Sequence, residues 1–145
     1  MRRIIIEADK CHGCKNCAVA CMKAHAPDGV AFSFTDPQFE SRNTILLDGE
    51  NKYKPLFCRH CDEPTCVSAC MSGAMTKNSA TGLVEYDPKK CGQCFMCVMN
   101  CQFGVLKPDS ELGIYVVKCD FCADDKEGPN CVRSCINKAI RVEEV

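Results

Sequence analysis

Cysteine is the residue type in this chain whose number and spacing point most directly to chemistry. Sixteen of the 145 residues are cysteines, and they fall into four groups of four with none left over. In chain order, the groups are Cys11, Cys14, Cys17 and Cys21; Cys58, Cys61, Cys66 and Cys70; Cys91, Cys94, Cys97 and Cys101; and Cys119, Cys122, Cys131 and Cys135. Thiolate sulfur is the usual ligand of iron–sulfur clusters and of structural zinc. Four complete groups of this ligand therefore predict four metal sites.

The spacing within the groups favours iron–sulfur clusters. Groups one and three both read C-x2-C-x2-C-x3-C, the ligand run of bacterial ferredoxins without its terminal proline. In that run three cysteines reach one cubane and the fourth points toward a neighbouring cluster. Groups two and four carry polar inserts at 62–65 and 123–130 that contain proline, which we interpret as surface loops. The pattern predicts four [4Fe–4S] clusters bound by all sixteen cysteines. Loss of one cysteine from a group would favour a [3Fe–4S] site, but every group has all four.

Disulfides and zinc are the alternative uses of these cysteines. The N-terminal segment has two arginines followed by only three apolar residues, whereas a secretory signal needs an apolar run of roughly 7–15 residues. We therefore expect a cytoplasmic protein, or one peripheral to a membrane complex, in a compartment where disulfides are rare. Zinc binds C-x2-C pairs, but four ligands complete a zinc site and leave the third closely spaced cysteine unexplained. A zinc-stabilised binding module remains the alternative of another class.

Composition limits the other function classes. The formal net charge is −1 and both signs are spread along the chain, so nucleic acid is not an expected partner. Four clusters of charge about −2 would bring the loaded chain to about −9. No stretch approaches the roughly 20 apolar residues of a membrane span, so no membrane insertion is expected. Since no phosphate-binding glycine motif and no nucleophile–base pair is visible, we predict electron transfer without catalytic residues or a small-molecule substrate.

Several side chains next to the cysteines are candidates for tuning a cluster. We expect exposed or packed positions for His12 and His60, with tuning as the alternative, and a surface position for His25. Gly13 and Gly92 lie in ligand loops, where bare backbone can approach sulfur closely. Basic side chains beside ligands are expected either to offset cluster charge or to be solvated; they are Lys15, Arg59, Lys90 and Lys118.

The elements that must hold these ligands are short. Each group ends in C-x3-C, a spacing that places two side chains on one helical face, so helices are expected over 17–21, 66–70, 97–101 and 131–135. Pro64 and Pro129 are suitable helix starts. Strand-like segments lie at 4–6, 44–47 and 139–142, and hairpins join 74–76 to 83–86 and 105–106 to 114–117. This pattern predicts an α+β fold, and with about 36 residues per cluster and no tryptophan it should need metal to fold.

Four cysteine groups, with extra residues in groups two and four, resemble the four-cluster electron-transfer subunits of the dimethyl sulfoxide reductase and formate dehydrogenase or hydrogenase type. Residues 57–66, FCRHCDEPTC, are similar to the second motif of that family. Residues 70–74 (CMSGA) and 101–104 (CQFG) stand where the family often has C-P-T-G-A and C-P-Y-G. Within the family, residues 70–75 and 94–99 look most like the small subunit associated with carbon monoxide dehydrogenase.

The resemblance implies two ferredoxin-like modules, one inserted into the other. The outer module would comprise residues 1–48 and 105–145, and the inner module residues 49–104. It also implies crossed ligation, in which the last cysteine of each group binds the cluster of the partner group. The implied ligand sets are Cys11, Cys14, Cys17 and Cys135; Cys58, Cys61, Cys66 and Cys101; Cys91, Cys94, Cys97 and Cys70; and Cys119, Cys122, Cys131 and Cys21. Such an outer module pairs the first and last strands, as the strand-like segments at the chain ends allow.

The resemblance further implies redox proteins as partners. The expected electron donor is a carbon monoxide dehydrogenase, and the expected acceptor is a hydrogenase or a flavin-dependent NAD(P) oxidoreductase. The alternative is the iron–sulfur subunit of a formate dehydrogenase, a hydrogenase or a molybdenum oxidoreductase.

Overall fold

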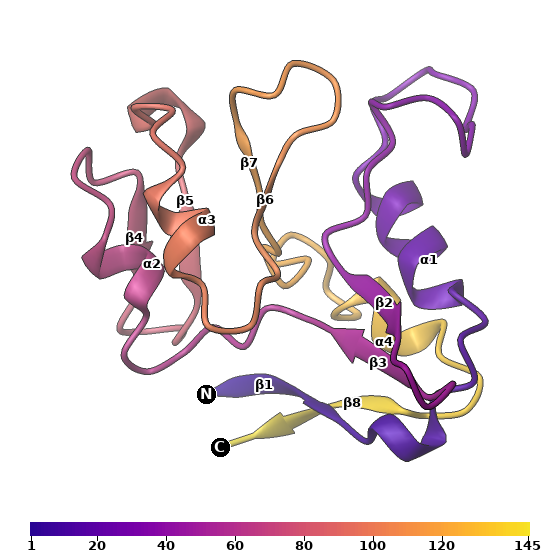
Figure 1. The fold of residues 1–145 in the computed structure, drawn as a ribbon. Coiled ribbons are helices and arrows are strands. Elements are labelled where there is room, and N and C mark those ends of the chain that lie inside the picture. The colour runs from indigo at the N-terminus through magenta and orange to yellow at the C-terminus, as the bar shows by residue number, and fades with distance from the viewer.

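The computed structural model describes all residues from Met1 to Val145 and consists of short strands and helices joined by loops (Figure 1). The strands are β1 (Arg2–Ile6), β2 (Thr44–Leu47), β3 (Tyr53–Leu56), β4 (Met75–Lys77), β5 (Val84–Tyr86), β6 (Lys107–Pro108), β7 (Val116–Val117) and β8 (Ile140–Glu144). The helices are η1 (Ala8–Lys10), α1 (Asn16–Ala24), α2 (Thr65–Ser68), η2 (Pro88–Lys90), α3 (Met96–Asn100) and α4 (Asn130–Arg133). The predicted mixture of small helices and strands is confirmed.

The two ends of the chain form one sheet. β1 and β8 pair antiparallel over five residue pairs, with Ile4 opposite Val142. Beyond the sheet, the Val145 N–H donates to the Met1 carbonyl at 2.8 Å. Ile4 and Ile140 are buried in the adjoining core. The strand-like segments at the two chain ends therefore pair with each other, and Figure 1 shows the termini side by side.

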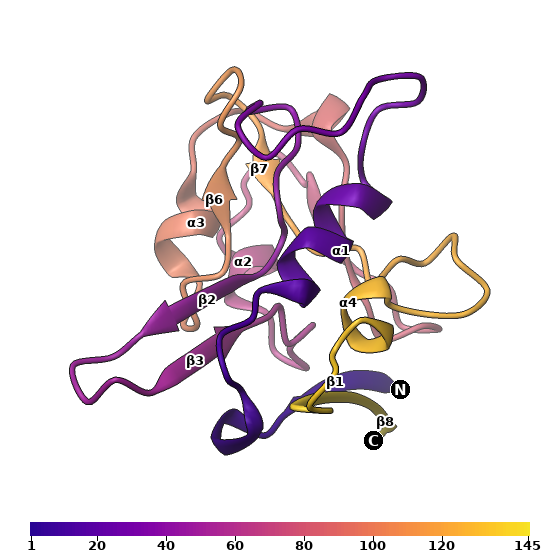
Figure 2. The ribbon, with the colours of Figure 1, turned by 90° about the vertical axis from the view of Figure 1, so that its right-hand side faces the viewer.

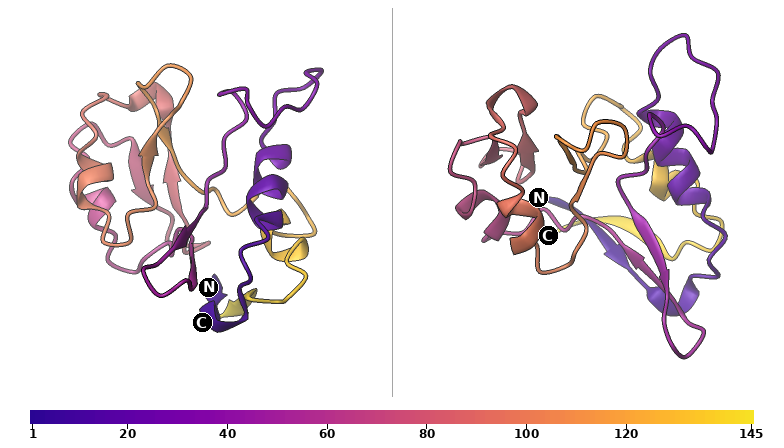
Figure 3. Two further views of the ribbon diagram at one scale, coloured as in Figure 1. Left: turned by 45° about the vertical axis from the view of Figure 1, so that its right-hand side comes forward. Right: turned by 45° about the horizontal axis from the view of Figure 1, so that its top comes forward.

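The helices pack in two pairs. α1 packs against α4, and α2 packs against α3. Figure 2 shows α1 beside α4, above the β1–β8 sheet. Figure 3 shows α2, α3 and the β4–β5 hairpin on the opposite side of the molecule from α1. Segments from the two ends of the chain thus lie together, and α2, α3 and the β4–β5 hairpin form a second group.

Two small hydrophobic cores lie beneath these pairs. The first contains Ile4, Cys17, Phe57, Leu83, Phe121, Cys131 and Ile140. The second contains Met75, Cys97, Leu106 and Val116. Cysteines are members of both cores, and Phe57 and Leu83 from the middle of the chain join the first. Cysteines of the ligand groups therefore lie within the two hydrophobic cores or pack against them.

Three of the four expected helices end earlier than the C-x3-C spacing predicts. α1 contains both Cys17 and Cys21, but α2, α3 and α4 end before the last cysteine of their groups. At Cys70 and Cys135 the chain tightens, because each N–H bonds to the carbonyl three residues back. A tightened turn rotates these side chains away from the helical face of the preceding cysteine. At Cys70 and Cys135, the chain therefore departs from the α-helical spacing that would keep the last cysteine beside the preceding one.

Strand and helix starts follow the sequence more closely. Pro64 and Pro129 directly precede α2 and α4, and β4 and β5 form the expected hairpin. The segment 44–47 is a strand, and its partner β3 was not expected. β6 begins two residues later than predicted, because the Asp109 carboxylate accepts the N–H groups of Leu112, Ile114 and Tyr115 and fixes the loop there. No helix has the length and apolar character needed to cross a membrane.

Candidate metal centres

All sixteen cysteines are free, and the structure gathers them across groups. In the first gathering, Cys135 joins the three leading cysteines of group one. Burial raises the pKa of Cys17 to about 11, the Ala18 N–H opposes this rise, and the charges of Cys135, Cys11 and Cys14 add to it. The packing of α4 on α1 brings these residues together from the two ends of the chain.

The second gathering lines a cavity. Its walls include Cys58, Cys61, Cys66 and Cys101 together with apolar side chains. Burial raises the pKa of Cys66 to about 11; the Lys118 ammonium opposes this rise, and the charges of Cys58 and Cys101 add to it. The three leading cysteines of group two therefore share one space with the last cysteine of group three.

The third gathering combines Cys70 with group three. Burial raises the pKa of Cys97, the N–H of the next residue opposes the rise, and the charges of Cys70 and Cys91 add to it. Cys94 is exposed in the same loop. The last cysteine of group two thus lies among the leading cysteines of group three. In the second gathering, the last cysteine of group three lies among the leading cysteines of group two.

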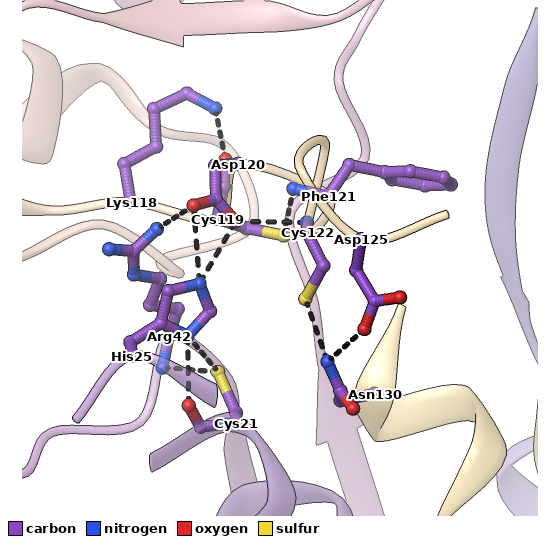
Figure 4. A network of polar contacts seen from close by, with 10 residues as sticks. All are labelled: Cys21, His25, Arg42, Lys118, Cys119, Asp120, Phe121, Cys122, Asp125 and Asn130. Carbon is purple, nitrogen blue, oxygen red and sulfur yellow. Dashed lines mark hydrogen bonds and ion pairs between the residues drawn. The ribbon is translucent and has the colours of Figure 1, made fainter. Parts of the chain in front are cut away.

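The fourth gathering lines a second cavity, whose walls include Cys21, Cys119, Cys122 and Cys131. Burial raises the pKa of Cys119 to about 12, and the charge of Cys58 raises it further. Burial also raises the pKa of Cys131, with Cys119, Cys21 and Cys122 as its charged neighbours. Figure 4 shows three of these four cysteines in one network of polar contacts.

This chemistry fits iron–sulfur clusters. The four cysteines that line each cavity offer only sulfur, a soft donor set that selects iron–sulfur clusters or zinc over calcium and magnesium. Burial raises the pKa of Cys17 and of Cys131, and the charges of neighbouring cysteines raise it further. At Cys21, the effect of burial is outweighed by contacts with His25 and Arg42, which lower the pKa of Cys21. Iron ions among these sulfurs would supply the positive charge that stabilises ionised thiols.

Backbone N–H groups already point at several of these sulfurs. Arg42 donates to Cys21 at 3.3 Å and Phe121 donates to Cys119 at 3.3 Å. Two further bonds, from Met75 to Cys70 and from Gln93 to Cys91, are each 3.4 Å long. N–H donors of this kind orient cluster ligands and stabilise negative charge on sulfur.

The ligand loops of groups one and three share a backbone conformation. Gly13 and Gln93 precede the second cysteine with φ of 70° and 57°, and Lys15 and Phe95 follow it with φ of 61° and 56°. Glycine is therefore not required at this position by φ alone, since Gln93 adopts it. Gly13 differs because a Cβ there would overlap the ring of Tyr53. Close approach of Tyr53, not of sulfur, thus explains this glycine.

We expect Gly13→Ala to destabilise the loaded protein by about 1–3 kcal/mol, because the added methyl displaces the Tyr53 ring. The measurement is the anaerobic thermal unfolding midpoint. Gln93→Ala is the matched control, because its loop position and φ are equivalent, and it should change the midpoint much less. Tyr53→Ala should remove most of the penalty of Gly13→Ala, and equal penalties with and without Tyr53 would contradict this explanation.

His25 is not the surface residue expected from the sequence. Its side chain is 15% exposed, and Nδ1 lies 2.8 Å from the Cys21 carbonyl and 3.7 Å from Cys21 Sγ. Nε2 donates to Asp120 at 3.1 Å, and Arg42 donates to the same carboxylate at 2.5 Å (Figure 4). Burial alone would lower the pKa of His25, but the bonds to Asp120 and Cys21 raise it to about 10. The i, i+4 spacing from Cys21 was the available sequence indication.

The remaining histidines divide between the two expected roles. His12 is exposed. His60 is only 2% exposed, and its Nδ1 accepts the Val84 N–H at 3.0 Å. Burial lowers the pKa of His60 to about 3, and the charges of Lys118 and Lys77 act in the same direction. The ring is therefore neutral with its proton on Nε2, a buried donor without a protein acceptor beside the cavity of the second gathering.

Known proteins are similar to this chain in sequence and in fold. The 4Fe-4S dicluster domain matches residues 50–145. The electron transport protein HydN of Escherichia coli (strain K12) is 31% identical over 96% of this chain and 86% of its own length. The beta subunit of NADH-dependent phenylglyoxylate dehydrogenase from Aromatoleum evansii is 33% identical over 95% of this chain, which spans only 29% of that subunit. The active site complex BamBC of benzoyl coenzyme A reductase has a chain with a TM-score of 0.55 and 28% identity, covering 99% of this chain and 79% of that chain.

Proposed function

Since the chain belongs to the 4Fe–4S dicluster domain family, we propose that it relays electrons through four [4Fe–4S] clusters from a catalytic oxidoreductase to a second redox protein. The family and the sixteen cysteines establish four [4Fe–4S] clusters as its cofactors. One observation carries the relay: two cavities are each lined by three cysteines of one group and the last cysteine of another. Clusters with ligands from two groups would lie next to each other, as electron transfer requires.

We propose crossed ligation for all four clusters. The last cysteines of groups one and four, Cys21 and Cys135, would exchange places, and so would Cys70 and Cys101. The early ends of α2 and α4 support this proposal, because at Cys70 and Cys135 the chain departs from the α-helical spacing that would keep the last cysteine beside the preceding one. So does the position of Cys135 beside Cys17.

The two-module arrangement is part of the proposal. The β1–β8 sheet and the α1–α4 pair support an outer module of residues 1–48 and 105–145. The β4–β5 hairpin and the α2–α3 pair support an inner module of residues 49–104. Each would be one ferredoxin-like unit with two clusters.

The contacts between sites suggest their order. The second core contains Cys97, and three further cysteines pack against it: Cys66, Cys70 and Cys101. This core therefore links the third site to the second. After burial, the charge of Cys58 is the largest influence that raises the pKa of Cys119, which links the second site to the fourth. The fourth and first sites meet where Cys131 lies near Cys17. Cys94 and Cys14, the two exposed cysteines, belong to the two end sites, where electrons would enter and leave.

For the partners, we propose a carbon monoxide dehydrogenase as donor and a hydrogenase or flavin-dependent NAD(P) oxidoreductase as acceptor. Residues 70–75 and 94–99, which resemble the carbon monoxide dehydrogenase-associated subunit, support this choice and lie around the third site. A formate dehydrogenase, hydrogenase or molybdenum enzyme is the second candidate donor, because residues 57–66 are similar to the second motif of the subunits that serve such enzymes.

The protein purified without oxygen should contain about sixteen iron and about sixteen sulfide per chain, with a broad absorbance near about 400 nm that bleaches on reduction. Four one-electron reductions should appear in a spectroscopic redox titration. A colourless protein with stoichiometric zinc would overturn the relay.

To distinguish the donors, bleaching is followed with catalytic amounts of carbon monoxide dehydrogenase and carbon monoxide, or of formate dehydrogenase and formate. Faster bleaching with the second pair would favour the second candidate.

A further inference from the structure

Lys118 is a buried lysine without a carboxylate partner. It is 5% exposed, and its Nζ donates to the Cys119 carbonyl at 2.8 Å. Nζ also contacts the sulfur of Cys58, whose Sγ lies 3.7 Å away. The ion pairs of the chain do not include Lys118. A buried ammonium is costly unless a negative charge compensates it, so thiolate and cluster sulfur are its only available counter-charges.

The position of Lys118 is the border between two sites. Cys58 is the first cysteine of group two and Cys119 the first of group four. Burial raises the pKa of both Cys66 and Cys119, and the Lys118 ammonium opposes the rise in each case. One side chain thus affects cysteines of both the second and the fourth gathering. The first cysteines of these gatherings, Cys58 and Cys119, are far apart in the sequence.

We propose that Lys118 supplies a positive charge shared by two neighbouring cluster sites, and that this charge raises the reduction potentials of both bound clusters. The inference rests on the proposed ligation of these sites. A cluster gains one negative charge when it is reduced, and a nearby cation in apolar surroundings favours that state. In the transfer step one electron leaves one cluster and enters its neighbour, with no bond made or broken and no proton moved. Lys118 would stabilise the electron on either side of the border.

The chain contains matched lysines that lack this environment. Lys10 and Lys90, like Lys118, directly precede the first cysteine of a group. Both are exposed, and each ends a short helical turn, η1 or η2. A charge in water is screened strongly, so neither should affect a cluster to the same extent. Burial, not sequence position, distinguishes Lys118.

The test compares Lys118→Gln, Lys118→Arg and Lys90→Gln in the full, cluster-loaded chain. The readout is the midpoint potential of each cluster in a titration followed by electron paramagnetic resonance. In Lys118→Gln, two of the four midpoints should move to lower potential while the other two stay unchanged. Lys118→Arg keeps the charge and should stay close to wild type, and Lys90→Gln should match wild type.

Each outcome decides between charge and packing. If Lys118→Gln loses about half of its iron while Lys118→Arg is fully loaded with iron, the result supports the shared charge. Equal loss in Gln and Arg variants would indicate packing alone and overturn the inference, as would four unchanged midpoints in a fully loaded Lys118→Gln chain. Failure of the relay itself is recognised separately, because the wild-type chain would then lack about sixteen iron or the four one-electron reductions.

Discussion

Replacing Cys135 by serine should disturb the cluster held by Cys11, Cys14 and Cys17, and leave the cluster at Cys119 and Cys122 intact. Serine oxygen is a harder and weaker ligand for these irons than thiolate. The iron content should fall by up to about four per chain, or one of the four spectroscopic signals should change. Cys135 belongs to group four in sequence, so this outcome is counterintuitive from the spacing alone. It follows from the position of Cys135 beside Cys17.

The matched control for this substitution lies in the same short segment. Cys131→Ser should disturb the cluster of Cys119 and Cys122, because Cys131 lines that cavity. Cys21→Ser should resemble Cys131→Ser, although Cys21 belongs to group one. Mössbauer and electron paramagnetic resonance spectra of the three variants assign each loss to a site. Identical spectra for Cys135→Ser and Cys131→Ser would show that group four binds its own cluster, and crossed ligation would be wrong.

The sequence predicted the four cysteine groups and the short elements around them because the spacing of these residues is local, whereas the ligand set of each cluster remains a prediction. The patterns used were three cysteines on one loop, a proline before α2 or α4, and short strand-like segments at β1 and β8, and each extends over only a few residues. The early ends of α2 and α4 were not predicted, because i, i+4 spacing does not distinguish an α-helical turn from a tighter one. Only the bonds of Cys70 and Cys135 to the third carbonyl back make that distinction.

Other features depended on contacts between distant segments. Lys10, Lys90 and Lys118 occupy the same position relative to a cysteine group, yet only Lys118 is buried. The sequence suggested that Gly13 lets the backbone approach sulfur closely. In the structure, the ring of Tyr53, forty residues later in the chain, packs against Gly13 instead. The contact of His25 with Asp120 joins residues that are far apart in the sequence, whereas its contact with Cys21 follows from the i, i+4 spacing. Such roles are set by tertiary packing, which local pattern does not contain.

Removing the iron should unfold most of this chain. Only 24 of the 145 residues are buried, and Cys17, Cys131 and Cys97 are among the core residues themselves. Helices of four residues and isolated two-stranded sheets are not stable alone in water. Metal binding in small metallo-domains contributes on the order of 10 kcal/mol, as much as the whole net stability of an ordinary domain. The helical signal in circular dichroism should therefore collapse after anaerobic treatment with acid or chelator.

Hydrogen exchange gives the decisive measurement for this last prediction. Amides in α1, α4 and the β1–β8 sheet should lose their protection together when iron is removed, since the helices of that pair hold ligands of the same sites. Adding iron and sulfide back should restore both the absorbance and the protection, which separates metal dependence from irreversible damage. A protein carried through the same treatment without chelator is the control. Native protection in the metal-free chain would mean that the apolar cores suffice, and that the clusters serve electron transfer alone.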